Sequence, residues 1–221
     1  MLTIVDLSHV IADGTVTYPG LPGPVISDHL SREDSRQRYA PGYEFQIGRI
    51  EMVSNTGTYL DTPFHRYADG SDLAALDLTR VVDVPGLLVD ATAEQEAGVI
   101  LLEGHDLAGR AVLFHTGWDE HWGSEHYGDP RHPYIAVRTA EQLVEAGAAV
   151  VGIDSVNIDD TRTGERPIHS ALLAAGIPIV EHLHRLDRLV GRSFTFTAAP
   201  PAVRGMGTFP VRAFAVLGAT G

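Results

Sequence analysis

The stretch SNTGTYLDTPFHRY, residues 54–67, dominates the interpretation of this 221-residue chain. Asp61 and His65 are its two side chains of the types that bind metals or transfer protons. Gly57 and Pro63 interrupt regular structure, so we expect a turn-rich connection that leaves a strand rather than a continuous helix. On these residues alone, a carboxylate that caps a turn beside a surface imidazole is the simpler interpretation.

Strand patterns flank this stretch on both sides. Residues 44–53 carry spaced apolar side chains and predict a long strand that leads into it. Other apolar runs predict strands at 2–7, 86–91, 110–115, 149–154, 177–181 and 211–217. Thr139 begins a capping-box pattern, which predicts the start of a helix, and Gly147 predicts its end. A second, short helix is expected at 170–175.

Helices and strands alternate in the second half of the chain. This order indicates an α/β fold with a mixed β-sheet flanked by helices. No linker, low-complexity tract or internal repeat divides the sequence. We therefore expect a single domain over residues 1–221, long enough to bury a full core without disulfides or a structural metal.

Two segments near the N-terminus depart from these patterns. Residues 18–24 are rich in proline and glycine and predict a rigid loop. Its Tyr18 either packs within the loop or forms an aromatic wall of a substrate pocket. Residues 29–42 are polar and charged, so we expect either a mobile loop or an extension that packs on a partner subunit.

The overall charge and composition limit the possible partners. The formal net charge of −13 disfavours nucleic acid and anionic membrane surfaces. Cysteine is absent, which excludes disulfides, thiolate metal sites and cysteine nucleophiles. No secretory signal pattern opens the chain, and no apolar run is long enough to span a bilayer. We expect a soluble, cytoplasmic protein that binds a cation or a small molecule.

Two carboxylates stand where ligands bind in α/β proteins, beyond the carboxyl ends of predicted strands, and a histidine lies between them in sequence. Asp154 and Glu181 each end an apolar strand pattern, where a carboxylate needs a partner. His169 lies twelve residues before Glu181, at the start of the intervening helix. From spacing alone, the simpler interpretation makes His169 a helix N-terminal residue and Glu181 a member of a salt bridge.

Other histidines are less informative. The His-rich segment 121–132 fits no standard metal-ligand spacing, so we expect a solvated loop there. His182 and His184 follow Glu181 closely, and either is a candidate for lining the same site. The signatures of serine-hydrolase elbows, Walker loops, dinucleotide-binding loops and H-E-x-x-H zinc helices are absent.

Residues 55–65 resemble the signature of the cyclase family of metal-dependent hydrolases, which includes kynurenine formamidases and isatin hydrolases. That signature reads H-x-G-T-H-x-D-x-P-x-H. Its Gly, Thr, Asp, Pro and last His are in register here, whereas Asn55 and Tyr59 replace the first two histidines. The resemblance runs from Asp6 to about Leu189. It includes an Asp-Leu-Ser-His opening, a Tyr-Pro-Gly turn, a Thr-Gly-Trp turn, and a Gly-Ile-Asp strand end followed by a His and a Glu.

The resemblance implies a swivelling β/β/α-like fold and a role for each matching residue. Asp61, His169 and Glu181 would hold one divalent metal, with zinc or manganese the expected ions, and His65 would be the general acid or base. The histidine ligands of a second metal are replaced at positions 55 and 59. Substrate-contacting positions would be Tyr18, Asn55, Tyr59 and Trp118.

The leading hypothesis is a metal-dependent hydrolase that cleaves an amide, lactam or lactone-type bond of a small molecule. Loss of two family ligands favours an alternative, a catalytically silent member that binds a small ligand. A third hypothesis is metal-free acid–base catalysis by His65 with Tyr59 and Asp61, such as a cyclisation or a lactone opening. The resemblance also implies a homodimer or larger homo-oligomer, with residues 29–42 as a candidate contact.

Overall fold

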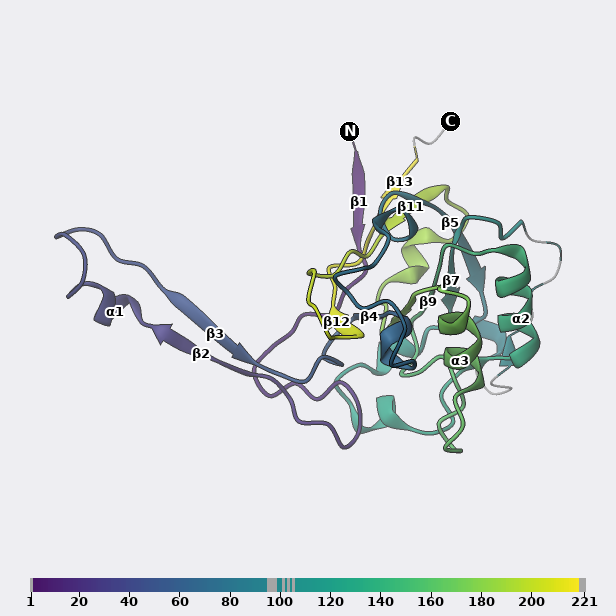
Figure 1. Ribbon diagram of the computed structural model, residues 1–221, viewed down its shortest axis with the longest axis horizontal. Coiled ribbons are helices and arrows are strands. Elements are labelled where there is room, and N and C mark those ends of the chain that lie inside the picture. The colour runs from purple at the N-terminus through teal and green to yellow at the C-terminus, as the bar shows by residue number, and fades with distance from the viewer. Residues whose placement is uncertain (1, 95–98, 101, 103, 105, 219–221) are drawn as a thin grey trace.

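The fold is built around one mixed β-sheet. The computed structural model describes residues 2–94, 99–100, 102, 104 and 106–218. Nine of its strands form one sheet in the order β1-β13-β11-β5-β7-β9-β10-β4-β12 (Figure 1). The strands are β1 Thr3–Asp6, β13 Phe214–Leu217, β11 Phe194–Thr197, β5 Val84–Asp90, β7 Ala111–His115, β9 Val150–Ile153, β10 Ile179–Glu181, β4 Tyr59–Asp61 and β12 Thr208–Pro210. The central strands β5, β7, β9 and β10 are parallel, and the outer pairs are antiparallel. The expected α/β fold with a mixed sheet is confirmed.

Two helices, α2 (Val137–Ala146) and α3 (Pro167–Ala174), pack on one face of this sheet (Figure 1). Val112 and Phe114 of β7 belong to the buried cluster that the helices share. Leu113, between them in sequence, belongs to a second buried cluster on the opposite face. Successive strand residues point to opposite faces, so β7, whose five residues are all buried, is covered on both faces.

The helix starts differ from the expected ones. Helix α2 begins at Val137, and its N-cap is Ala136, which makes no side-chain capping hydrogen bond. Thr139 is buried inside the first turn, so the capping-box prediction is wrong: core packing takes the chain into the helix earlier. Gly147 ends α2 as expected, in a left-handed conformation with φ 71°. Helix α3 begins early, at Pro167, because a proline's missing N–H has no cost at the first helical position.

The stretch 54–67 contains a short buried strand at its centre, so the expectation of a connection made of turns is wrong there. Strand β4 pairs with β10 on one side and with β12 on the other, and all three of its residues are buried. Turns enclose it as predicted: Gly57 has φ 66°, and a 3-10 turn, η1 (Pro63–His65), follows. The strand thereby holds Asp61 rigidly inside the sheet.

A separate two-stranded arm, residues 25–51, projects from the body (Figure 1). It consists of β2 (Val25–Leu30) and β3 (Ile47–Glu51), paired antiparallel, with the short helix α1 (Arg32–Ser35) between them. The strand predicted at 44–53 is therefore confirmed as the shorter β3, but it belongs to the arm. Residues 36–51 are exposed throughout.

The remaining described elements are short. Strands β6 (Val99–Ile100) and β8 (Tyr134–Ile135) form a parallel pair. Short 3-10 helices occur at η2 Leu78–Arg80, η3 Thr92–Glu94, η4 Trp118–His121, η5 Glu125–Gly128 and η6 Leu186–Leu189. Among the helices of the described residues, none has the length and apolar character needed to cross a membrane.

Candidate metal and acid–base site

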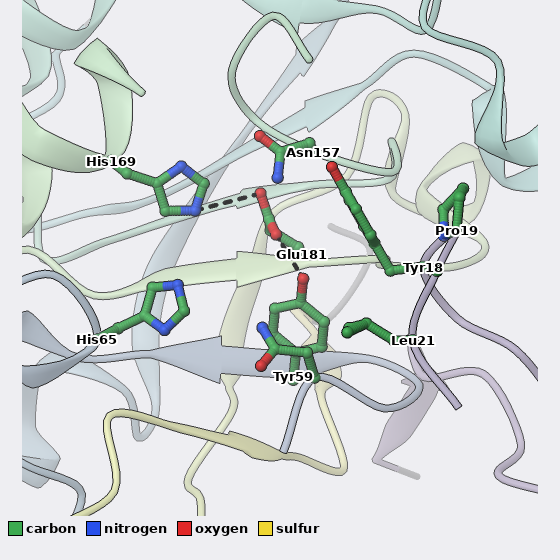
Figure 2. Close-up of a pocket in the computed structure, with 10 residues that line it drawn as sticks. Tyr18, Pro19, Leu21, Tyr59, His65, Asn157, His169 and Glu181 are labelled. Atoms are coloured by element: carbon green, nitrogen blue, oxygen red, sulfur yellow. Dashed lines mark hydrogen bonds and ion pairs between the residues drawn. The ribbon is translucent and has the colours of Figure 1, made fainter. Parts of the chain in front are cut away.

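A pocket of about 350 Å³ lies where β4 and β10 meet the start of α3 (Figure 2). The antiparallel pairing of β10 with β4 places Glu181 opposite Tyr59 and Ile179 opposite Asp61. Six of the eight expected site residues line this pocket, although they come from segments far apart in sequence. The pocket is lined by Tyr18, Pro19, Gly20, Leu21, Asn55, Tyr59, His65, Asn157, His169 and Glu181.

Asp61 is completely buried and only partly satisfied. Its Oδ1 accepts a hydrogen bond from the hydroxyl of Thr208, which lies opposite it in β12. Its Oδ2 is buried without a hydrogen-bond partner among the described residues. An isolated buried carboxylate oxygen is costly unless a donor or a cation compensates it. The structure therefore gives Asp61 the character of a ligand rather than of a turn cap.

His169 directs one ring nitrogen at this carboxylate. Its Nδ1 lies 2.6 Å from Asp159 Oδ2, and Asp159 also accepts from the backbone N–H groups of Ile168 and His169. With Nδ1–H donated to Asp159, Nε2 lies 3.7 Å from Asp61 Oδ2 and 3.6 Å from Glu181 Oε1. A carboxylate that fixes the far nitrogen of a histidine is the usual outer partner of a metal ligand.

The charges around His169 favour a cation at its Nε2. Burial by itself lowers the pKa of this imidazole, but the carboxylates of Glu181, Asp159 and Asp61 outweigh burial and raise the pKa to about 10. The surroundings thus stabilise one positive charge between Asp61 and Glu181. A divalent metal meets the same requirement while using the lone pair of Nε2, so the residues present fit a metal ion.

Glu181 is also buried, and both its oxygens already accept hydrogen bonds. Oε1 accepts from the backbone N–H of Ile158 at 2.7 Å, and Oε2 accepts from the Tyr59 hydroxyl at 2.8 Å. Burial raises the pKa of Glu181 to about 7, with His169 opposing and Asp61 reinforcing that rise. Each oxygen keeps a further lone pair, so Glu181 is available to a metal but is held in place by the protein.

Tyr59 is part of a directional chain of hydrogen bonds. Its phenol donates to Glu181, so it accepts from His182 Nε2 at 3.2 Å, and His182 Nδ1 accepts from the Tyr127 hydroxyl at 2.7 Å. Burial, followed by the charges of Glu181 and Asp61, raises the pKa of Tyr59 well above its usual value. Tyr59 is therefore a neutral donor to Glu181. At a position where the resemblance implies a ligating nitrogen, Tyr59 thus offers a hydrogen bond to Glu181 instead.

His65 stands at the open side of the pocket, with its side chain 37% exposed. Its Nδ1 is 2.8 Å from Thr208 Oγ1 and 3.6 Å from Asp61 Oδ1. Since Thr208 donates its one hydroxyl proton to Asp61, it accepts from His65 Nδ1–H, which leaves Nε2 with the lone pair. That arrangement is the one a general base requires.

The group of side chains whose geometry could hold a metal ion shares two of its three members with the expected ligand set. Among the described residues, the ligating atoms of Asp61, His65 and His169 lie within 4.8 Å of one another. The expected set holds Glu181 in place of His65, and Glu181 Oε1 also approaches His169 Nε2, to 3.6 Å. Asp61 and His169 are common to both sets and form the fixed part of the candidate centre.

The two aromatic residues Tyr18 and Trp118, both expected to contact the substrate, differ in position. Tyr18 lines the pocket, which favours its interpretation as a pocket wall over packing within the loop alone. Trp118 is not among the lining residues: it is buried against Tyr127 and Val156, and its indole N–H donates to the Tyr127 carbonyl at 2.9 Å. Trp118 supports the wall from behind, next to Tyr18.

Asp154 is fully engaged in structure rather than in the pocket. Its carboxylate accepts from the backbone N–H groups of Thr116 and Gly117 and lies 2.9 Å from His115 Nδ1. It thereby fixes the turn that positions Trp118. In the His-rich segment, the expectation of a solvated loop is wrong for His132, which is completely buried and lies 3.0 Å from Thr161 Oγ1.

Sequence reasoning missed four residues of this site: Asn157, Asp159, Thr208 and Tyr127. Asp159 and Asn157 follow the predicted strand 149–154 closely, so the same rule that selected Asp154 could have included them. Thr208 and Tyr127 carry no local signal, since only tertiary contacts bring them to the site. Of the two histidines after Glu181, His182 joins the site network, whereas His184 pairs with Asp119 at 2.8 Å.

The chain thus combines a mixed α/β sheet with a small pocket beside a buried carboxylate and a buried imidazole. The family model described as Putative cyclase matches residues 5–160, and the chain belongs to that family. The resemblance found in the sequence is confirmed.

The sequences of curated relatives align with nearly the whole chain. The kynurenine formamidase of Geobacillus thermodenitrificans strain NG80-2 is 30% identical over 211 residues, which is 95% of each chain. That of Bacillus cytotoxicus is 28% identical over 210 residues, again 95% of each chain.

Solved structures share the fold. An isatin hydrolase bound to the product analogue thioisatinate superposes with a TM-score of 0.81 at 23% identity, covering 97% of this chain and 92% of the other. A potential metal-dependent hydrolase with cyclase activity gives a TM-score of 0.77 at 24% identity, covering all of both chains.

Proposed function

We propose that this protein is a metal-dependent hydrolase that cleaves an amide, lactam or lactone-type bond of a small molecule. The observation that carries the proposal is the buried, unpartnered Oδ2 of Asp61 facing Nε2 of His169, whose other nitrogen is fixed by Asp159. The relatives named kynurenine formamidase support the choice of a carbon–nitrogen bond.

Asp61 and His169 would hold one divalent metal, with Glu181 as the third protein ligand. Carboxylate and imidazole ligands suit zinc or manganese. When bound, such an ion lowers the pKa of a coordinated water and polarises the carbonyl of the substrate. Tyr59 keeps Glu181 oriented through its hydrogen bond, and the same bond disfavours a second ion on that side of the carboxylate.

His65 would transfer the proton. Nε2 of His65 accepts a proton from the attacking water and passes it to the leaving nitrogen or oxygen of the substrate. Thr208 holds the ring through Nδ1, so the same nitrogen faces the pocket throughout the reaction.

Chelation tests this proposal directly. Protein stripped of metal by a chelator, dialysed, and supplied with zinc or manganese is expected to hydrolyse simple aryl formamides and lactams only in the metal-supplied samples. The readout is release of the aryl amine or opening of the ring. Equal hydrolysis before and after metal addition would contradict the metal-dependent mechanism.

A specific observation favours a second candidate, acid–base catalysis without a metal. The chain from His65 through Thr208 to Asp61 orients an imidazole by a carboxylate and needs no ion for its geometry. Activity that survives chelation and disappears with His65 would support this candidate. A silent, ligand-binding family member would show neither activity.

We also propose that the protein is a homodimer or a larger homo-oligomer, joined through the arm (residues 25–51). An isolated two-stranded hairpin is only marginally stable in water, and exposed apolar side chains on one mark an interaction surface. Side chains of this kind on the arm are Val25, Ile26, Tyr39, Tyr43, Phe45, Ile47 and Ile50. A cytoplasmic location is proposed with it, supported by the absence of cysteine.

Light scattering tests the assembly. The full chain is expected to give a mass of at least twice the 23.8 kDa of one chain. Combined replacement of Tyr43, Phe45 and Ile47 by serine should shift it towards the monomer, because these side chains are about half exposed on the arm. The same triple change made at the exposed Leu2, Leu78 and Val137 serves as a control and should leave the mass unchanged. A parent mass near 23.8 kDa would refute the assembly.

A further inference from the structure

The two sides of the pocket differ in chemistry. Figure 2 shows Tyr18, Pro19 and Leu21 on one side, facing His65 and His169 on the other. The first side offers an aromatic ring and two aliphatic side chains. It therefore suits a flat, apolar part of a ligand, while the reacting bond lies towards the histidines.

No lysine or arginine belongs to the residues that line the pocket in the described part of the chain. Two arginines on neighbouring elements are engaged elsewhere. Arg66, next to His65, donates to Ser170 Oγ at 3.2 Å and lies over the Tyr67 ring. Arg166, at the start of α3, donates to three backbone carbonyl oxygens, those of Asp160, Thr163 and Glu165. Neither the lining residues nor these two arginines thus provide a free cation for an anionic substituent.

The buried groups of the site are acidic. Asp61, Asp159 and Glu181 are all nearly or completely buried and carry three formal negative charges when ionised. A divalent metal offsets two of them, which leaves the centre without net positive charge. A carboxylate on the substrate, away from the metal, would then be desolvated beside like charges and without a partner.

One fixed donor favours an uncharged polar group instead. Asn157 is buried and lines the pocket, and its Oδ1 accepts from the backbone N–H of Asp159 at 2.9 Å. That bond assigns the amide orientation, so the NH₂ group of Asn157 is left to donate. A neutral carbonyl is a good acceptor for such an amide, and it needs no counter-ion.

We infer that the substrate is an uncharged, flat aryl amide or lactam that has one aromatic ring and carries no carboxylate. The inference rests on the proposed hydrolase function and narrows its substrate class. The ring lies against Tyr18 and Leu21, a neutral carbonyl accepts from Asn157, and the scissile bond faces His65. The cavity of about 350 Å³ agrees with one small ring system, because ligand pockets range from roughly 300 to 1,000 Å³.

Two isosteric compounds with the same scissile bond test whether the pocket disfavours a carboxylate on the substrate. These are 3-formamidobenzamide, which is neutral, and 3-formamidobenzoate, which is anionic. The metal-loaded protein is expected to hydrolyse the amide with a kcat/KM about 100-fold higher than that of the benzoate, since like charges in a pocket cost several kcal/mol. Equal or faster hydrolysis of the benzoate would overturn the inference.

A variant pair ties the preference to the pocket. Leu21→Arg places a cation on the apolar wall, and it should raise the benzoate-to-benzamide ratio of kcat/KM about tenfold. Leu78→Arg makes the same charge change on an exposed 3-10 helix outside the pocket and should leave the ratio unchanged. An equal change in both variants would point to overall charge rather than to the lining, and would contradict the assignment.

Binding separates this inference from the proposed function. If the metal-loaded protein hydrolyses neither compound, the hydrolase proposal fails. Calorimetry with the two compounds and the chelator-treated protein still measures the charge preference of the pocket. Tighter binding of 3-formamidobenzamide supports the inference that the pocket prefers an uncharged ligand. Equal or tighter binding of the benzoate overturns that inference independently of catalysis.

Discussion

Replacement of His169 by alanine is expected to abolish both the bound metal and the hydrolysis. The imidazole supplies the only nitrogen of the fixed Asp61–His169 pair, and Asp159 orients it. Loss of a partner that merely orients a ligand weakens metal affinity by about 10- to 100-fold, so loss of the ligand itself should exceed that range. Metal content by mass spectrometry and kcat/KM for an aryl formamide measure the two effects.

A matched histidine makes that result interpretable. His126 lies outside the pocket with its side chain 48% exposed, and its ring packs on Trp118 rather than on a candidate ligand, so His126→Ala removes an imidazole but no ligating group. It should retain the parent's metal and activity. If His169→Ala keeps its metal while remaining folded, the ion sits elsewhere and the ligand assignment is wrong.

Replacement of His65 by glutamine is expected to lower kcat by about 100- to 10,000-fold while the metal is retained. The amide of glutamine can still donate to Thr208, so the local hydrogen bond is preserved. It cannot exchange a proton near neutral pH, so the transfer to the leaving group is lost. Single-turnover kinetics together with metal analysis of the purified variant provide the measurement.

The His65 experiment also decides between the two ligand sets. Asp61, His65 and His169 form the tightest group of ligating atoms in the described residues, whereas the proposal uses Glu181 as the third ligand. Loss of metal together with activity in His65→Gln would make His65 a ligand and leave the proton-transfer role without a residue. Loss of metal in Glu181→Gln but not in His65→Gln is the result that the proposal requires.

The sequence predicted much of this site because its signature is local. Asp61 and His65 lie four residues apart in one turn-bounded segment, and the strand-end rule selected Glu181, whereas His169 was assigned from the family resemblance. The mixed α/β sheet followed from the order of apolar runs. These features depend on periodicity and on turn residues, which single-sequence patterns report well.

The remaining features depend on contacts between distant segments. Thr208 reaches Asp61 across 147 residues of sequence, and Tyr127 reaches His182 across 55, so no local pattern contains either pair. His182 has φ 57°, a backbone turn that a strand pattern does not predict for a histidine. The start of α2 was set by burial of Thr139, which a capping pattern ignores.

Metal stoichiometry tests the central claim most directly. The full chain, prepared without a His-tag, would be incubated with zinc or manganese, freed of excess ion, and analysed for metal per chain beside His169→Ala. We predict close to one equivalent in the parent and none in the variant. No bound metal in the parent, or metal that persists in His169→Ala, would contradict a mononuclear hydrolase centre at Asp61 and His169.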